Sequence, residues 1–325
     1  MVLVIDAVDV ERVLDYPTAI GAVEDAFRDL GSGKAVMPVR LAIRVEPHDG
    51  MSSFMPAYLS GKNQLGIKIV SGFQRNKEKF GLPTVVGSIL LLDARNGSLM
   101  SIIDGTSVTA IRTAAASAVA TRHMAREDAT TLGIFGAGVQ GETHILAIPK
   151  VRKISKVLVT SPDVKKCEEF CARLSVKTGL KIRVALPKET ASSDIVVTAT
   201  NSKTPVIDGD WVSKGAHVNG IGSHTPATRE LDDKIVTSSR VVVDSMEANL
   251  KEAGDLLIPI AESRFAKDRI YAELADIVLG RKKGRESQEE ITLFKSVGIA
   301  IEDISVASAV YERAKALNTG RNVEM

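Results

Sequence analysis

The chain of 325 residues has little of several residue types, and each shortage excludes a class of protein. Two cysteines, Cys167 and Cys171, are too few for a disulfide framework, and their spacing places them on one face of a helix. They have no neighbouring ligands, so we expect no metal. Aromatic residues make up only 4%, which disfavours a stacking platform for nucleic-acid bases. A reducing compartment, by default the cytoplasm, fits this composition.

Neither charge nor long apolar runs indicate a special partner. The 42 basic and 40 acidic residues give a formal net charge of +2, without the basic excess typical of nucleic-acid binding. Apolar runs such as 89–92 are far shorter than the ~20 residues that span a bilayer. Acidic residues interrupt the N-terminal segment, so we expect no signal peptide. The length allows about two domains, and we predict no membrane or nucleic-acid partner.

In the first 126 residues, a predicted helix is followed by predicted strands and then by a second predicted helix. Apolar residues at helical spacing over 11–30 predict a helix that ends at Gly31. Short β-rich segments between 37 and 103, broken by Gly, Pro, Asn or Asp, predict a predominantly antiparallel sheet with a hairpin-type turn at 93–97. An alanine-rich segment over 107–126 predicts a long helix.

After residue 130, predicted strands alternate with predicted helices or loops. Apolar strands over 131–245 are separated by helical or loop segments, which is typical of a parallel sheet with crossovers. Residues 291–317 predict a loop followed by an amphipathic helix. We therefore predict an α/β protein in which a Rossmann dinucleotide-binding domain accompanies an α+β domain with a largely antiparallel sheet.

A glycine motif, G-x-G-x-x-G, lies between a predicted strand and a predicted helix. The first glycine would allow a tight turn, the second a close approach of pyrophosphate, and the third close packing of helix on strand. The alternative is a purely structural turn, but the strand and helix on either side favour dinucleotide binding. The candidate contacts are Gly136, Ala137, Gly138, Val139, Gln140 and Gly141.

The next strand gives a weaker indication of which dinucleotide binds. An acid that holds the ribose 2′-hydroxyl of NAD is expected near Ser161, where none stands, although Asp163 is close. Ser161, Lys165 and Lys166 would suit a 2′-phosphate, which weakly favours NADP(H) over NAD(H). The alternative is that both lysines belong to a solvated helix face.

Several longer segments together resemble the ornithine cyclodeaminase and mu-crystallin family over essentially the whole chain. They are MPVR at 37–40, GLPTVVGSILLLDARNG at 81–97, DGTSVTAIRTAAASAVATRHMAR at 104–126, FGAGVQG at 135–141, GSHTPATRELD at 222–232 and GRESQEEITLFKSVGIAIEDI at 284–304. The resemblance implies a substrate-binding and dimerisation domain over 1–115 with 305–325, and a Rossmann domain over 116–304. It also implies a homodimer that pairs two antiparallel sheets.

The resemblance extends to candidate site residues. Arg40 and Arg112 match the family's carboxylate-binding positions, and arginine suits a carboxylate because its planar fork makes two hydrogen bonds. A structural ion pair is the alternative for Arg112. Lys68 matches the active-site lysine, although its place in an alternating strand would otherwise indicate a solvent-facing residue. His224 replaces an aspartate of the cyclodeaminases and is either a proton carrier or an ordinary loop residue.

These matches imply a function and further cofactor contacts. We expect NAD(P)H-dependent reduction of a cyclic imino acid, either pyrroline-2-carboxylate to L-proline or piperideine-2-carboxylate to pipecolate. Alternatives are an alanine dehydrogenase, an ornithine cyclodeaminase, which the loss of the aspartate disfavours, and a non-catalytic dinucleotide-dependent binding protein. The remaining candidate cofactor contacts are Thr113, Thr198, Ala199, Thr200, Ser296, Val297 and Gly298.

Overall fold

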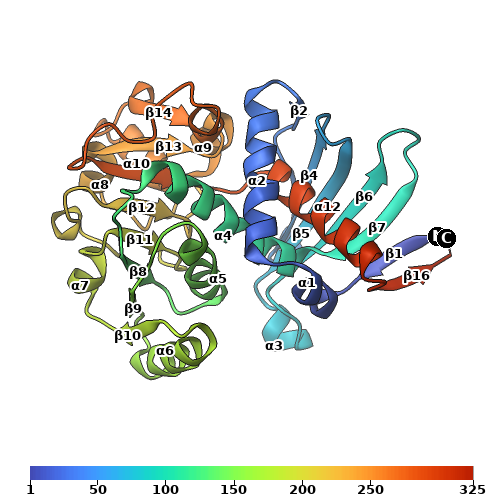
Figure 1. Cartoon of the computed structure of the whole chain (residues 1–325), viewed down its shortest axis with the longest axis horizontal. Coiled ribbons are helices and arrows are strands. Elements are labelled where there is room, and N and C mark those ends of the chain that lie inside the picture. The colour runs from blue at the N-terminus through green and yellow to red at the C-terminus, as the bar shows by residue number, and fades with distance from the viewer. Residues whose placement is uncertain (325) are drawn as a thin grey trace. The chain divides into compact units, whose positions relative to one another are not determined.

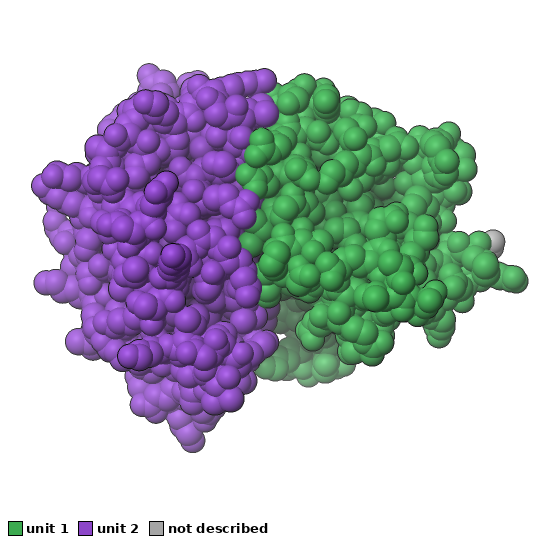
Figure 2. Space-filling model, in the orientation of Figure 1, with its two compact units in different colours: residues 1–113, 299–325 green, residues 114–298 purple. Residues whose placement is uncertain are grey.

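The computed structural model describes residues 1–324, which form two compact units (Figure 2). Unit 1 contains residues 1–113 and resumes at Ile299, and unit 2 contains residues 114–298. The division predicted from the sequence differs in its bounds, because it places the crossings after residues 115 and 304. The chain leaves unit 1 within a long helix, α4 (Gly105–Met124), and returns just before another, α12 (Ala300–Ala316).

Unit 1 is built on an eight-stranded sheet with the strand order β16-β1-β7-β6-β5-β4-β2, and β3 pairs with β4. Only the pair of β1 and β7 is parallel. Besides α4 and α12, the elements are β1 (Val2–Ile5), α1 (Ala7–Val13), α2 (Tyr16–Gly31), β2 (Ala35–Val36), β3 (Leu41–Val45), η1 (Glu46–His48), β4 (Gly50–Leu59), β5 (Gln64–Phe73), α3 (Asn76–Phe80), β6 (Val85–Asp93), β7 (Leu99–Asp104) and β16 (Arg321–Val323).

Two helices cover one face of this sheet. Figure 1 shows α2 and α12 lying side by side over the strands, and α12 packs on β4, β5 and β6. Inward-facing side chains such as Met55, Leu59 and Ile89 are almost completely buried there. The predicted turn at 93–97 connects β6 and β7, and Gly97 adopts a φ of +76° in it.

Unit 2 is built on a second eight-stranded sheet, in which every pairing is parallel. Its strands are β8 (Thr131–Phe135), β9 (Lys156–Thr160), β10 (Lys181–Val184), β11 (Ile195–Thr198), β12 (His217–Gly220), β13 (Ser239–Val243), β14 (Ile270–Glu273) and β15 (Ile291–Lys295). The helical elements between them are α5 (Val139–Ala147), η2 (Ile148–Lys150), α6 (Val164–Thr178), α7 (Pro187–Ala191), η3 (Gly209–Trp211), α8 (Asp233–Ser238), α9 (Met246–Glu252), α10 (Gly254–Ala261), η4 (Lys267–Arg269) and α11 (Leu274–Val278).

The strand order of this sheet fixes where a ligand can bind. The order is β10-β9-β8-β11-β12-β15-β13-β14, so successive strands run outward from β8 to β10 and then restart beside β8 at β11. This reversal is the topological switch point, and ligands of open parallel sheets bind outside the carboxyl ends of the strands there. The glycine motif follows β8 directly. The predicted α/β class, with one largely antiparallel sheet and one parallel Rossmann sheet, is therefore confirmed.

Two sequence-based expectations about elements were wrong. The helix predicted over 11–30 is two helices, because Asp15 caps a new helix, α2, in which Pro17 occupies the first turn. The loop predicted at the start of 291–317 is β15, a strand between β12 and β13. Lys295 ends the apolar pattern of that segment, and its full burial could not be anticipated from local sequence.

Among residues 1–324, none of the helices combines the length and the apolar character that crossing a lipid bilayer requires.

Candidate active site

The glycine turn joins β8 to α5 in unit 2. Gly136 has a φ of +112°, and a Cβ there would lie 2.4 Å from the carbonyl oxygen of Ala199. A Cβ on Gly141 would lie 2.2 Å from the carbonyl oxygen of Gly136, so only glycine lets α5 pack this closely on the turn. A Cβ on Gly138 would have no neighbouring protein atom within 4 Å. A phosphate fits here, because helix geometry leaves the first N–H groups of α5 without intrahelical partners.

A cleft of about 1090 Å³ lies along the carboxyl ends of β8, β9, β10 and β11. Its volume is slightly above the usual range of small-molecule sites, about 300–1,000 Å³. The predicted cofactor contacts that line it are Gly136, Ala137, Gly138, Ser161, Ala199 and Thr200. The other predicted contacts near the glycine turn and on β11 are not among the residues that line the cleft. Val139 and Gln140 begin α5, Gly141 is buried within α5, and Thr198 is buried within β11.

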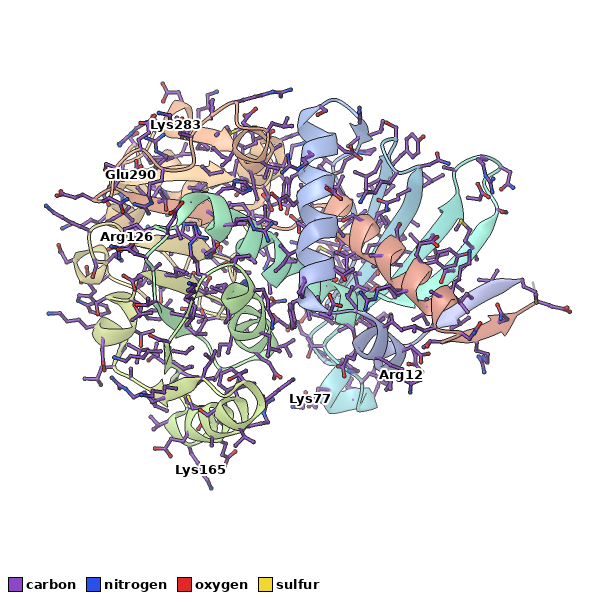
Figure 3. The ribbon with its side chains drawn as sticks, in the orientation of Figure 1. Arg12, Lys77, Arg126, Lys165, Lys283 and Glu290 are labelled. Carbon is purple, nitrogen blue, oxygen red and sulfur yellow. The ribbon has the colours of Figure 1, made fainter. Side chains whose placement is uncertain are left out.

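Acidic and basic side chains both follow β9, where the ribose of a dinucleotide would bind. Asp163 caps α6 by accepting the Lys166 N–H, and its carboxylate also lies 2.9 Å from the Lys166 ammonium. Lys165 projects from α6 into solvent (Figure 3). Neither lysine is among the described residues that line the cleft, whereas Arg183 and Glu189 are, and these two form an ion pair. The preference for NADP(H) is therefore not confirmed.

A buried carboxylate holds the ends of β11 and β12 together. Glu230 is fully buried and accepts hydrogen bonds from the Thr200 N–H at 2.5 Å, the Thr200 hydroxyl at 2.6 Å and the Gly222 N–H at 2.6 Å. Burial raises the pKa of Glu230, which the hydrogen bonds from Thr200 oppose. Because Thr200 lines the cleft and Gly222 follows β12, Glu230 fixes the edge at which a dinucleotide would bind.

A buried ion pair between Asp255 and Lys295 holds the backbone at Glu230. Asp255 accepts the backbone N–H groups of Glu230 and Leu231 at 2.7 and 2.9 Å. Its second oxygen lies 3.1 Å from the ammonium of Lys295, which also donates to the Ser223 carbonyl oxygen at 2.6 Å. Both charged groups are fully buried, so each needs the other to offset its desolvation.

Another buried carboxylate shapes the loop that begins at Ser296. Asp244 accepts the Ser296 hydroxyl at 2.8 Å and the N–H groups of Val297 and Gly298 at 2.8 and 2.7 Å. Gly298 has a φ of +77°, which favours glycine. Asp244 thus sets the conformation of this loop. A contact between the loop and the nicotinamide stays a prediction.

His224 is an exposed loop residue in unit 2. Its Nδ1 lies 3.1 Å from the carbonyl oxygen of Gly222, so this nitrogen carries a proton and donates it. That contact is the one expected of an ordinary loop histidine. A role for His224 as a proton carrier stays a prediction.

In unit 1, four charged side chains meet between β5, α4 and α12. The ammonium of Lys68 lies 2.6 Å from Oδ2 of Asp303, and Nε of Arg112 donates to Oδ1 of the same carboxylate at 2.9 Å. Arg112 also donates through Nη1 to Glu302. Lys68 is 2% exposed, Arg112 is 5% exposed and both acids are fully buried. The solvent-facing alternative for Lys68 is therefore wrong.

This arrangement gives Lys68 an unusual proton affinity. Burial, the largest cause, and the charges of Arg112 and Arg40 lower the pKa of Lys68, Asp303 acts in the opposite direction, and the net result is a pKa of about 8. A lysine with this pKa can donate or accept a proton near neutrality. The contribution of Arg40 means that its guanidinium lies close enough for its charge to act on Lys68.

Two other predicted residues have clear surroundings. Arg112 forms the ion pair that was the alternative to a substrate clamp, and its further contact with a carboxylate ligand stays a prediction. Thr113 donates its hydroxyl to the carbonyl oxygen of Thr109 within α4 at 2.7 Å. This is ordinary helical back-bonding, and a cofactor contact by Thr113 likewise stays a prediction.

Sequence reasoning missed all of the buried acids. Glu302 and Asp303 stand in the first turn of α12, where acidic residues are common because they favour the helix dipole. The available signal was their apolar setting, since Ile301 and Ile304 flank them. A charge pair inside an apolar stretch requires buried partners, and Lys68 and Arg112 are those partners.

Comparisons with known proteins show the family to which the chain belongs. A profile of the ornithine cyclodeaminase/mu-crystallin family matches residues 1–318. A Delta(1)-pyrroline-2-carboxylate reductase of Bacillus cereus is 37% identical over 325 residues, covering 99% of either chain.

Solved structures are similar over the whole chain. The Delta(1)-pyrroline-2-carboxylate reductase of Thermococcus litoralis, in complex with NADH and L-proline, has a TM-score of 0.95 and 43% identity and covers 99% of this chain and 100% of its own. An archaeal alanine dehydrogenase dimer with bound NAD has a TM-score of 0.94 and 33% identity, with coverage of 100% and 99%. By the profile match and by these relatives, the chain belongs to the ornithine cyclodeaminase/mu-crystallin family.

Proposed function

We propose that the protein is an NAD(H)-dependent reductase that converts a cyclic imino acid to the corresponding amino acid. Pyrroline-2-carboxylate, which gives L-proline, is the first candidate substrate, and piperideine-2-carboxylate is its six-membered alternative. The relatives named as pyrroline-2-carboxylate reductases support this choice. The observation that carries the proposal is the buried Lys68, which is held by Asp303 beside Arg112 and has a pKa near neutrality.

Lys68 supplies the proton that the reaction consumes. Reduction of the ring C=N bond adds a hydride to carbon and a proton to nitrogen, so the imine needs an acid that is charged at neutral pH and can release its proton. An ordinary lysine holds its proton too tightly for this role, whereas burial brings Lys68 into the useful range. The ammonium transfers its proton to the ring nitrogen and later regains one from solvent.

Arginine side chains bind the substrate carboxylate. Arg112 is fixed by two buried acids, which orients its guanidinium before the substrate arrives. Arg40 is half-buried and contributes a positive charge that acts on Lys68. Together they account for recognition of a 2-imino acid rather than a simple cyclic imine.

The cleft of unit 2 holds the dinucleotide. Gly138 admits the pyrophosphate to the N-terminus of α5, and Ser161 lies at the ribose end. The bound NADH supplies the hydride. The sequence weakly favours NADP(H). In the cleft, the charge of Arg183 would attract a 2′-phosphate, whereas that of its partner Glu189 would repel it.

A second candidate is amino-acid dehydrogenation, because the alanine dehydrogenase dimer has nearly the same fold. In that reaction a free keto acid and ammonia replace the cyclic imine. Ornithine cyclodeamination is disfavoured because His224 stands where the cyclodeaminases carry an aspartate. Binding without turnover would leave the buried Lys68 without a role.

The protein acts as a homodimer through the sheet of unit 1. One face of that sheet is covered by α2 and α12, whereas Leu41 and Ile43 on β3 and Val85 on β6 are at least half exposed. Exposed apolar side chains on one sheet mark an interaction surface. Light scattering after size-exclusion chromatography should give twice the monomer mass, and Ile43→Glu should shift it toward the monomer.

The decisive test is nicotinamide absorbance with purified protein. NADH and NADPH are supplied in turn with pyrroline-2-carboxylate, with piperideine-2-carboxylate, or with pyruvate and ammonia. Fast oxidation with a cyclic imine supports the reductase and identifies both the cofactor and the ring size. Turnover restricted to pyruvate and ammonia assigns an alanine dehydrogenase. No oxidation with any substrate, but ammonia released from ornithine, would mean that the reductase proposal is wrong.

A further inference from the structure

The charged cluster of unit 1 contains one group that touches both cations. Asp303 lies 2.6 Å from the Lys68 ammonium through Oδ2 and accepts the Arg112 Nε–H at 2.9 Å through Oδ1. Glu302, its neighbour in α12, contacts Arg112. The two acids are equally buried and one residue apart, yet among the contacts that the structure describes it is Asp303 that reaches the lysine.

The surroundings of Lys68 make this contact decisive. Its partners across the sheet are Met55 on β4 and Ile89 on β6, which are uncharged. Charges reach it from α4 through Arg112, from the segment before β3 through Arg40, and from α12 through Asp303. Both arginines and the apolar setting disfavour an ammonium ion, and Asp303 alone in this set favours it. Loss of Asp303 would therefore lower the pKa of Lys68 further.

We propose that Asp303 is a positioning residue, which keeps Lys68 charged as the proton donor and fixes the Arg112 guanidinium with the same carboxylate. Asp303 acts through these two side chains and exchanges no proton with the substrate. The inference deepens the proposed function, because it rests on Lys68 as the donor.

The geometry favours one carboxylate over two separate ones. An aspartate has a single short stem, so binding through both oxygens fixes the distance between the lysine and the arginine. A proton donor and a carboxylate clamp must be held in a fixed relation for a ring whose nitrogen and carboxylate are attached to the same carbon. Being buried, the carboxylate is also screened little by solvent.

Two isosteric variants separate contact from charge. Asp303→Asn and Glu302→Gln each remove one buried negative charge from neighbouring positions, but only the first removes a partner of Lys68. The first readout is the titration of the Lys68 side chain in the protein without ligand. It is monitored by NMR of ¹³C-labelled lysine, and Lys68→Met assigns the signal. The second is the pH profile of kcat and KM for imine reduction.

We expect the Lys68 signal to titrate near pH 8 in the unchanged protein. Asp303→Asn should move the midpoint at least about one pH unit lower, and kcat/KM at pH 8 should fall at least about fivefold, because the protonated fraction of Lys68 drops from about a half to about a tenth. Glu302→Gln should move the midpoint much less and act mainly on KM through Arg112. An unchanged midpoint in Asp303→Asn, or equal shifts in both variants, would overturn the proposal.

Asp303→Glu covers the case in which the asparagine variant does not fold. It keeps the charge but displaces the carboxylate by one methylene, so the Lys68 midpoint should stay near that of the unchanged protein while kcat falls. Full activity in Asp303→Glu would refute a positioning role. If the unchanged protein reduces no imine, the proposed function fails, but the NMR titration still decides whether Asp303 controls Lys68.

Discussion

Replacing Gly138 with alanine should abolish tight dinucleotide binding while leaving the fold intact. Gly138 caps α5 with a φ of −108° and a ψ of −168°, an extended conformation that alanine adopts without strain. A Cβ at this position meets no other part of the protein within 4 Å. It would instead occupy the space that a pyrophosphate needs at the helix N-terminus.

The expected magnitudes differ sharply between stability and binding. Alanine narrows the unfolded ensemble, which stabilises by about 0.4–1 kcal/mol, but it is a poorer N-cap than glycine, which costs about 1 kcal/mol or less. The two effects nearly offset, so Tm should change by no more than about 4 °C. Loss of hydrogen bonds to a charged phosphate costs about 1.5–3 kcal/mol, which raises Kd by roughly tenfold to over a hundredfold.

Isothermal titration calorimetry with NADH, beside thermal unfolding of the ligand-free protein, measures both quantities. Gly21→Ala is the matched control, since Gly21 lies in α2 of unit 1 with open space around its Cβ position, and it should leave Kd unchanged. Gly141→Ala should instead lower Tm, because its Cβ would lie 2.2 Å from a backbone oxygen that cannot rotate away. A Gly138→Ala protein that binds NADH within twofold of the original would refute the assignment of the phosphate site.

Three other predictions concern single side chains. Lys68→Met should lower kcat by at least about a hundredfold, and in the unchanged protein kcat/KM for imine reduction should fall as pH rises through about 8, because the lysine of the free enzyme then loses the proton that it donates; a flat profile over pH 6–10 would count against the role. Glu230→Gln turns an amide N–H₂ toward groups that are themselves donors, so calorimetry should show a several-fold weaker NADH affinity together with a lower Tm. His224→Asp should allow release of ammonia from ornithine, measured by a coupled ammonia assay; no ammonia would mean that this residue does not decide between the two reactions.

Local patterns predicted much of the fold. The glycine turn and the strands over 131–245 were predicted because the buried strands of a parallel sheet are continuous apolar runs separated by helices. The antiparallel strands between 37 and 103 were found because turn residues separate them. These signals lie within about ten residues, and nothing distant alters them.

The charged sites could not be predicted in the same way. Lys68 has the alternation of a solvent-facing strand residue, and only the resemblance to a family indicated otherwise. Its partner, Asp303, is more than two hundred positions away in the chain, and pairing across such a separation has no local signature. Lys295 concealed β15 for the same reason, because its charge interrupts the strand pattern and its partner Asp255 lies on another element.

The charge balance of unit 1 predicts that substrate binding loads the proton donor. Lys68 and Arg112 carry two positive charges against Asp303 and Glu302, and Arg40 adds a positive charge that lowers the pKa of Lys68. An arriving carboxylate brings the missing negative charge, so the pKa of Lys68 should rise above about 8 on binding. At pH 8, pyrrole-2-carboxylate, an analogue that carries the carboxylate but no basic nitrogen, should therefore bind with uptake of a fraction of a proton, which calorimetry detects as a binding enthalpy that depends on the ionisation enthalpy of the buffer. Lys68→Met should remove the uptake, and uptake that persists in this variant would place the titrating group elsewhere. A donor that is charged by its own substrate is ready before reduction begins, and this linkage needs the arginines and the lysine in one cluster.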